Sequence, residues 1–222
     1  MIRRAYESQS RSFGMLLYNP TMTSQGDLGP VPFFEYGTML QIANMHLLPD
    51  GRSLIETYGT TRFRVLRHGS LDGYLVGKVE RVDDMSTAAE EALEAAETAI
   101  SNRNFSAQDH FNAPPHHTPP QIQRQPLTPA EINCLPTQQL MEIGTSFVKK
   151  MREQSAPWLN STVFQAYGEC PEHPALFAWW FASVLPIHET QKYKLLATTS
   201  VRERLKICAN WISALEAQRW YE

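Results

Sequence analysis

The sequence predicts an α+β fold in which a β-rich half precedes a helical half. From residue 13 to residue 82 the apolar residues form short runs of strand formers with turn signals between them. After Met85 they recur at spacings of three and four, the helical period. We therefore expect a β-rich subdomain over 1–84, a helix over 85–104, a flexible insertion over 105–127 and a helical subdomain over 128–222.

Five strands are expected in the first half, at 13–18, 38–47, 53–58, 62–67 and 74–82. Polar and apolar side chains alternate along residues 62–65, so Phe63 and Val65 share one face of a half-buried sheet. The arginines between them then point outward. The string Pro-Asp-Gly-Arg at 49–52 predicts a hairpin loop, and Gly59 and residues 69–73 mark further turns. Residues 20–32 read as a loop.

The helices of the second half begin at capping patterns. Thr87 and Glu90 form a capping-box pattern, and Ala89, Leu93, Ala96 and Ile100 line one apolar face behind it. Residues 106–126 are polar and proline-rich, and no periodic apolar set offsets the entropy of ordering them. A capped helix starts at 128–131, followed by the stripe at 140, 143, 147 and 151. Further helices start at Pro174 and at 200–203.

Composition and charge exclude several classes of protein. Lysine and arginine number 20 against 23 acidic residues, a net charge of −3, so no basic excess favours nucleic acid. The longest apolar run, 175–185, is too short to span a membrane. Three separated cysteines exclude a zinc finger and oppose a disulfide framework, so we expect a reducing compartment, cytoplasmic or nuclear.

Few residues offer chemistry of their own. His116 and His117, with His110 nearby, could share a metal ion, but no cysteine or carboxylate lies at ligand spacing, and a solvated linker explains them better. Cys170 with a later histidine could form a nucleophile pair, although no known signature surrounds it. The acidic pairs at 83–84 and 90–91 are read as charges near a helix N-terminus, and the ring cluster at 179–181 as core. We predict no catalytic, cofactor-binding or metal-binding residue.

Three strings in order resemble the LON substrate-binding domain family. They are FEYGTMLQI at 34–42, LLPDGRS at 47–53 and GTTRFRVL at 59–66, followed by the tyrosine-led YLVGKVE at 74–80. Each motif is weak alone, whereas four in order with matching gaps are specific. TSVRERL at 199–205 resembles the helical half of the same domain in proteins that join it to a RING finger. The resemblance covers most of the chain outside 20–32 and 102–127.

The resemblance implies a partly open, β-barrel-like (PUA-like) subdomain followed by a helical bundle. It also implies recognition of protein or peptide clients without catalysis, as part of a LON-RING type ubiquitin-ligase protein acting in protein degradation. The alternative is the substrate-engaging N-terminal domain of an ATP-dependent Lon-type protease. Glu35, Tyr36, Gly37, Arg62 and Arg64 belong to the resembling strings and are the expected partner-binding residues.

The start of the chain departs from the family pattern. Relatives usually carry two strands before the segment that residues 1–12 resemble, and this sequence lacks them. We therefore expect a truncated β half with uncovered core and unpaired sheet edges. Such edges favour aggregation or pairing with another chain, which predicts self-association.

Overall fold

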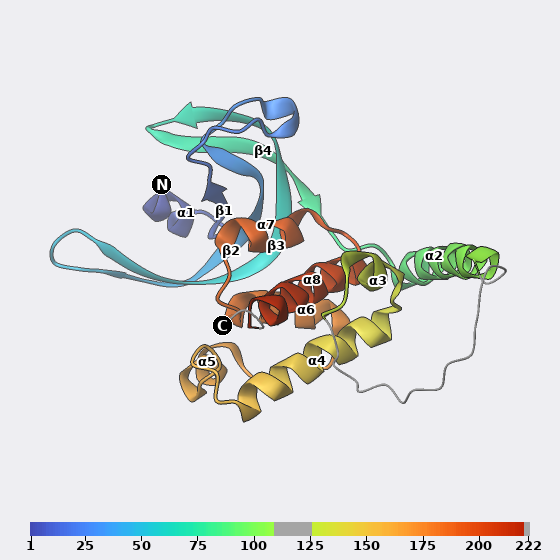
Figure 1. Ribbon diagram of the computed structural model, residues 1–222. Coiled ribbons are helices and arrows are strands. Elements are labelled where there is room, and N and C mark those ends of the chain that lie inside the picture. The colour runs from blue at the N-terminus through green and yellow to red at the C-terminus, as the bar shows by residue number, and fades with distance from the viewer. Residues whose placement is uncertain (109–125, 220–222) are drawn as a thin grey trace. The chain divides into compact units, whose positions relative to one another are not determined.

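The computed structural model describes residues 1–108 and 126–219, with side chains described for 1–98 and 126–217. The chain forms two compact units, Met1–Asp83 and Asp84–Glu222, called unit 1 and unit 2 below. Unit 1 is a curled antiparallel sheet with one short helix, and unit 2 is helical (Figure 1). The predicted α+β fold, a partly open barrel-like sheet followed by helices, is confirmed.

Unit 1 contains a four-stranded sheet in the order β1-β2-β3-β4, with each strand antiparallel to the next. Its elements are α1 (Ile2–Glu7), β1 (Ser12–Tyr18), the 3-10 turn η1 (Gly26–Leu28), β2 (Phe33–Leu47), β3 (Ser53–Leu71) and β4 (Tyr74–Val82). β2 and β3 are much longer than their neighbours, so their joined ends project as a two-stranded hairpin beyond the rest of the sheet (Figure 1).

The hairpin turn forms where the sequence predicts it. The Leu48 amide donates to the Arg52 carbonyl at 2.8 Å, and Gly51 takes a positive φ of 85°. The Asp50 carboxylate accepts the Arg52 amide at 3.0 Å and the Arg52 side chain at 2.6 Å. A left-handed conformation costs glycine little, so this loop closes without strain.

Two strand boundaries were predicted wrongly. The strands expected at 53–58 and 62–67 are one continuous strand, β3, and Gly59 pairs with Leu40 inside it instead of turning the chain. The pairing register shifts beside Leu40, so an irregularity in the ladder accommodates this glycine. β2 also starts at Phe33, earlier than expected, because Phe33 pairs with Tyr18 and is buried.

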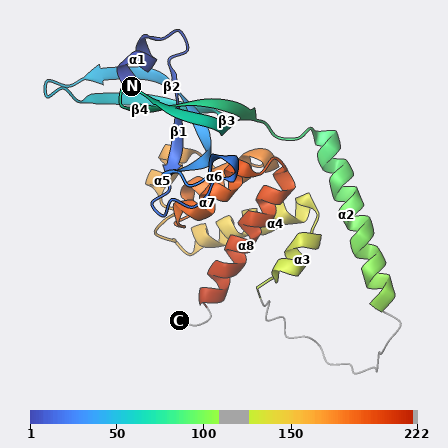
Figure 2. The same ribbon diagram turned by 90° about the horizontal axis from the view of Figure 1, so that it is seen from above.

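Unit 2 is built from helices around one apolar core. The helices are α2 (Thr87–Gln108), α3 (Pro129–Cys134), α4 (Thr137–Glu153), α5 (Ser161–Tyr167), α6 (Pro174–Val184), α7 (Glu189–Ala197) and α8 (Val201–Arg219). In both views α2 is a straight helix at the side of the group formed by α4, α6 and α8 (Figures 1 and 2). Phe177, Phe181 and Leu205 lie in the core and are at most 1% exposed.

The aromatic cluster of α6 is core, as the sequence indicates. The Phe181 ring lies 5.4 Å from that of Phe177 and 6.1 Å from that of Phe147. Trp180 is 7% exposed and donates its indole N–H to the Gly168 carbonyl at 3.0 Å. A buried indole needs such an acceptor, so this bond fixes the end of α5 against α6. Trp220 and Tyr221 lie outside the described residues.

The capping predictions are partly right. Thr128 and Glu131 form the predicted capping box at α3. At α2 the Ser86 hydroxyl, one residue before the predicted cap, accepts the Ala89 amide at 3.3 Å. Glu90 does not complete a box at its own helix, because its carboxylate binds the start of α8 instead. The acidic charge does act at a helix N-terminus, but at that of another helix.

Candidate functional site

The curled sheet of unit 1 encloses an apolar groove with a cavity volume of about 650 Å³. Side chains from α1 and from all four strands line it. Its apolar lining includes Phe13, Leu16, Phe33, Phe63, Val65 and Val79. A concave, mostly apolar surface of this size is typical of a binding site.

Strand alternation places these side chains. Phe63 and Val65 are two residues apart on β3, so both point to the groove, and they are 3% and 4% exposed. Two glycines make room for the Phe63 ring. A Cβ at Gly14 or at Gly37 would lie 2.8 Å from its Cζ atom, well inside contact distance. Gly37, the glycine of the FEYGTMLQI string, therefore shapes the floor of the groove.

The two outer strands of the described sheet, β1 and β4, both contribute to the groove. An outer strand carries backbone N–H and C=O groups that point away from the sheet and can pair with another chain. On β4 two apolar side chains that line the groove are open to solvent: Leu75 is 53% exposed and Val79 is 39% exposed. The groove thus combines apolar surface with backbone groups that an extended peptide can reach.

A polar cluster marks one end of the groove. Arg4 of α1 donates to Asp72 at 2.9 Å and to the Tyr74 hydroxyl at 2.5 Å, and its guanidinium lies 5.9 Å from the centre of the Tyr74 ring. All three side chains lie at or near the β3–β4 turn, whose Asp72 and Gly73 have positive φ. These contacts hold α1 against the turn. They also place a cation beside an apolar surface.

Three of the five residues predicted to bind partners lie together. The Arg64 Nε atom donates to Glu35 at 3.0 Å, and the Arg64 guanidinium lies 5.9 Å from the centre of the Tyr36 ring. Tyr36 and Arg64 are opposite each other in the β2–β3 register. The hydrogen bond and the charge of Glu35 raise the pKa of Arg64 above its ordinary value. The Arg64 side chain is 35% exposed and that of Glu35 is 17% exposed.

The other two predicted residues, Gly37 of β2 and Arg62 of β3, lie one position apart in the β2–β3 register. Gly37 is buried opposite Phe63, and a Cβ there would lie 2.3 Å from the Met15 carbonyl oxygen. Arg62 stands opposite Thr38 on one side and Val82 on the other. Because Arg62 and Arg64 alternate with Phe63 and Val65, both arginines point to the face opposite the groove.

The groove residues outside the resembling strings were not named from the sequence. Phe13 and Leu16 lie on β1, and no local pattern shows that the curl of the sheet brings them to one surface with Val79 of β4. The alternation at 62–65 did identify Phe63 and Val65 as the inward pair. That signal, extended to β1 and β4, is the one that could have outlined the site.

Two of the three thiols, those of Cys170 and Cys208, are poor candidates for a nucleophile. Burial, followed by the charge of Glu169, raises the pKa of Cys170 to about 11, and burial raises that of Cys208 to about 12. Both thiols therefore stay protonated near neutral pH, which opposes the idea that Cys170 and a histidine form a nucleophile pair. Cys134, Cys170 and Cys208 form no disulfide. His110, His116 and His117 lie outside the described residues, and within the described ones no group of three or more His, Cys, Asp or Glu side chains could hold a metal.

Among the helices that the structure describes, none has the length and apolar character needed to cross a bilayer. α6 is the most apolar of them and has only 11 residues.

Comparison with known proteins gives a consistent result. The family model described as the ATP-dependent protease La (LON) substrate-binding domain matches residues 1–214. A curated LON peptidase N-terminal domain and RING finger protein from Schizosaccharomyces pombe is 24% identical over 187 residues, which is 84% of this chain. The chain spans only about a third (32%) of that relative.

Two solved structures are also similar. A Lon N-terminal domain protein from Xanthomonas campestris has a TM-score of 0.49 at 18% identity, over 94% of this chain and 80% of the other. The N-terminal domain of a Mycobacterium avium complex Lon protease has a TM-score of 0.49 at 17% identity, over 96% and 82%.

Proposed function

We propose, from the premise that this chain belongs to the LON substrate-binding domain family, that it is a non-catalytic module which recognises protein clients for degradation. The curated relative, which carries a RING finger, supports a LON-RING type ubiquitin-ligase protein as its setting. The observation that carries the proposal is the apolar groove of unit 1, which has an outer strand on either side.

The groove fits an extended polypeptide segment with apolar side chains. Such a segment pairs its backbone with β4 or β1 and places alternate side chains against Phe33, Phe63 and Val65. Folded proteins bury segments of this kind, whereas unfolded or damaged proteins expose them. This distinction would let the groove select clients for degradation.

A charge placed on the groove wall tests the proposal. Leu75 is 53% exposed and lines the groove, so Leu75→Lys is tolerated by the fold but opposes apolar binding. Leu54 is 63% exposed on the β2–β3 hairpin and does not line the groove, so Leu54→Lys is the matched control. Binding of a fluorescent, permanently unfolded protein is measured by anisotropy.

We expect Leu75→Lys to weaken binding about tenfold or more, because losing one apolar side chain contact is worth roughly 1.5–3 kcal/mol. Leu54→Lys is expected to bind like the wild type. Equal binding by both variants and the wild type would show that clients do not bind in the groove.

The predicted residues on the opposite face form a second proposed contact area. Glu35, Tyr36, Arg62 and Arg64 are partly exposed, with the Arg64 side chain at 35% and that of Glu35 at 17%. The fifth predicted residue, Gly37, is buried and shapes the groove floor instead. Arg64→Ala separates two roles. Weaker client binding at an unchanged melting temperature supports contact between Arg64 and the client. A lower melting temperature with unchanged binding instead assigns Arg64 a structural role, holding Glu35 of β2.

The proposal carries three further expectations. The partners are proteins or peptides, and neither nucleic acid nor membranes. The compartment is cytoplasmic or nuclear, in keeping with three cysteines that form no disulfide. Self-association through β1 or β4 would compete with clients, so sedimentation at rising concentration is expected to show dimers that Leu75→Lys reduces; a monomer at every concentration would refute this last expectation.

A further inference from the structure

Helix α2 turns its acidic side chains, and not its apolar ones, toward the rest of unit 2. Glu90, Glu94 and Glu97 follow at spacings of four and three, which places them on one helical face. The predicted apolar face is the outward one: Ala89 and Ala96 are exposed, and Leu93 is 39% exposed. The apolar face read from the sequence is therefore not buried at Ala89, Leu93 and Ala96.

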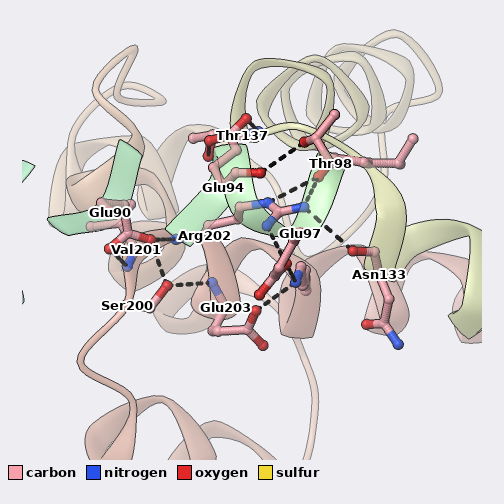
Figure 3. Close-up of polar contacts among 12 residues, drawn as sticks. Glu90, Glu94, Glu97, Thr98, Asn133, Thr137, Ser200, Val201, Arg202 and Glu203 are labelled. Carbon is pink, nitrogen blue, oxygen red and sulfur yellow. Dashed lines mark hydrogen bonds and ion pairs between the residues drawn. The ribbon is translucent and has the colours of Figure 1, made fainter. Parts of the chain in front are cut away.

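Glu90 binds the N-terminus of α8 (Figure 3). Its carboxylate accepts the Ser200 hydroxyl at 2.5 Å, the Val201 amide at 3.2 Å and the Arg202 amide at 2.9 Å. These amides have no partner within their own helix, and the helix dipole favours negative charge at that end. Ser200 in turn accepts the Glu203 amide at 3.1 Å, so a single carboxylate completes the cap.

Glu94 repeats this arrangement at α4. It accepts the Thr137 amide at 3.0 Å and the Thr137 hydroxyl at 2.6 Å, at the first residue of that helix. The N-cap residue of α4 is Pro136, which has no side chain oxygen to offer. A residue from a distant helix therefore satisfies the amide that a local serine or threonine would ordinarily satisfy.

Glu97 meets two buried cations. It forms an ion pair with Arg202 and another with Lys206 at 3.0 Å, and these cations are only 2% and 7% exposed (Figure 3). Arg202 also donates to the Leu135 carbonyl, and Lys206 to Glu203 at 2.6 Å. Burial alone would raise the pKa of Glu97, but Lys206 and Arg202 outweigh it and hold the pKa below its ordinary value.

We propose that α2 is a salt-sensitive latch, a helix attached to unit 2 by its three carboxylates and able to detach while the core stays folded. Release would uncover the N-termini of α8 and α4 and two cations, Arg202 and Lys206. This inference concerns unit 2 alone and does not depend on the groove of unit 1.

The chemistry of the attachment carries the proposal. No residue of α2 with a described side chain is buried, so little apolar surface is lost when the helix leaves. None of the buried core residues of unit 2 comes from the part of α2 whose side chains are described. The Glu97 side chain is 36% exposed, so salt reaches this carboxylate and screens its ion pairs, whereas apolar burial strengthens or stays constant. Salt therefore acts on the latch and not on the core.

Hydrogen exchange by mass spectrometry on the whole chain tests the latch. Raising sodium chloride from about 0.05 M to about 0.5 M, where the Debye length falls below 5 Å, is expected to speed exchange of α2 amides at 92–98 severalfold. Amides of α4 and α6 are expected to keep their rates. Salt-independent exchange in α2 would overturn the proposal.

Two variants and a control localise the effect. Glu97→Gln and Glu94→Gln are each expected to speed exchange in α2 about tenfold at low salt. Glu91 is exposed on the same helix, so Glu91→Gln changes the charge equally without touching the latch and is expected to match the wild type. If Glu97→Gln also loosens α4 and α6 by leaving Arg202 and Lys206 unpaired, Glu94→Gln decides, because its partner is uncharged. Equal rates for Glu94→Gln and Glu91→Gln would refute the latch.

Discussion

Unit 1 and unit 2 bury their apolar residues to very different extents. The apolar cluster of unit 1 has four buried members, Val31, Phe33, Phe63 and Val65, whereas that of unit 2 has eighteen, drawn mainly from α4, α6 and α8. A unit with a full core is stabilised by its own packing. A unit that leaves apolar strands in solvent has surface to offer to a partner, and for this reason we assign recognition to unit 1.

The largest expected effect comes from a cavity in the core of unit 2. Phe181 is 0% exposed and touches Phe147 and Phe177, so Phe181→Ala is expected to destabilise unit 2 by about 3–5 kcal/mol. All five tryptophans lie in unit 2, so tryptophan fluorescence during denaturation reports this unit alone. Exchange of β2 and β3 amides is expected to be unchanged; their parallel loss of protection would mean that the two units unfold together.

The next effect concerns a buried charge in unit 2. Arg204 is 0% exposed and donates to both Asp84 oxygens at 2.5 and 2.6 Å, with its guanidinium 4.8 Å from the Trp179 ring centre. Asp84→Ala leaves that cation unpaired, which is expected to cost about 3 kcal/mol. Asp83→Ala is the control, because its partner Arg81 is 66% exposed. A destabilisation no larger than the control's would show that Arg204 does not depend on Asp84.

Backbone crowding in unit 1 gives a smaller effect. A Cβ at Gly37 would lie 2.3 Å from the Met15 carbonyl oxygen, so Gly37→Ala is expected to force β1 and β2 apart and destabilise unit 1 by roughly 1–3 kcal/mol. Gly69 has nothing within 4 Å, and Gly69→Ala is the matched control. Amide exchange in β1 and β2 is the measurement, and tryptophan fluorescence is expected to stay constant. Equal exchange in both variants would show that a Cβ at Gly37 does not force β1 and β2 apart.

The smallest effect tests a helix cap in unit 2. Thr128 accepts the Glu131 amide at 3.3 Å and donates its own amide to the Glu131 carboxylate at 2.7 Å. Thr128→Ala removes half of this box and is expected to cost about 1 kcal/mol, read as a lower denaturation midpoint by tryptophan fluorescence. Thr128→Ser keeps the cap and is expected to match the wild type. A full loss in the serine variant would point to packing of the threonine methyl instead.

The sequence predicted what depends on neighbouring residues. Alternation at 62–65 identified the inward Phe63 and Val65, and the glycine of the 49–52 loop identified the hairpin. The family resemblance is confirmed by a model match over 1–214. Gly59 misled because a glycine signals a turn and a ladder irregularity equally well, and only the pairing with Leu40 distinguishes them.

The face of α2 could not be predicted for a similar reason. Its period shows two stripes, one apolar and one acidic, and the sequence alone drew attention only to the apolar one. The acidic stripe faces inward because two helix N-termini, Arg202 and Lys206 satisfy it, and these partners lie far along the chain. The groove was missed likewise, since the curl of the sheet brings distant strands together.

The distance between Glu90 and Ser200, 110 positions in sequence, also orders events during synthesis. A chain made from its N-terminus completes α2 long before Ser200, Arg202 and Lys206 leave the ribosome. Until then Glu90 and Glu97 have only water as a partner, and Glu94 alone can meet its own partner, Thr137. The sheet of unit 1 can therefore fold first, and attachment of α2 waits for α8, which makes it one of the last steps in the maturation of the chain.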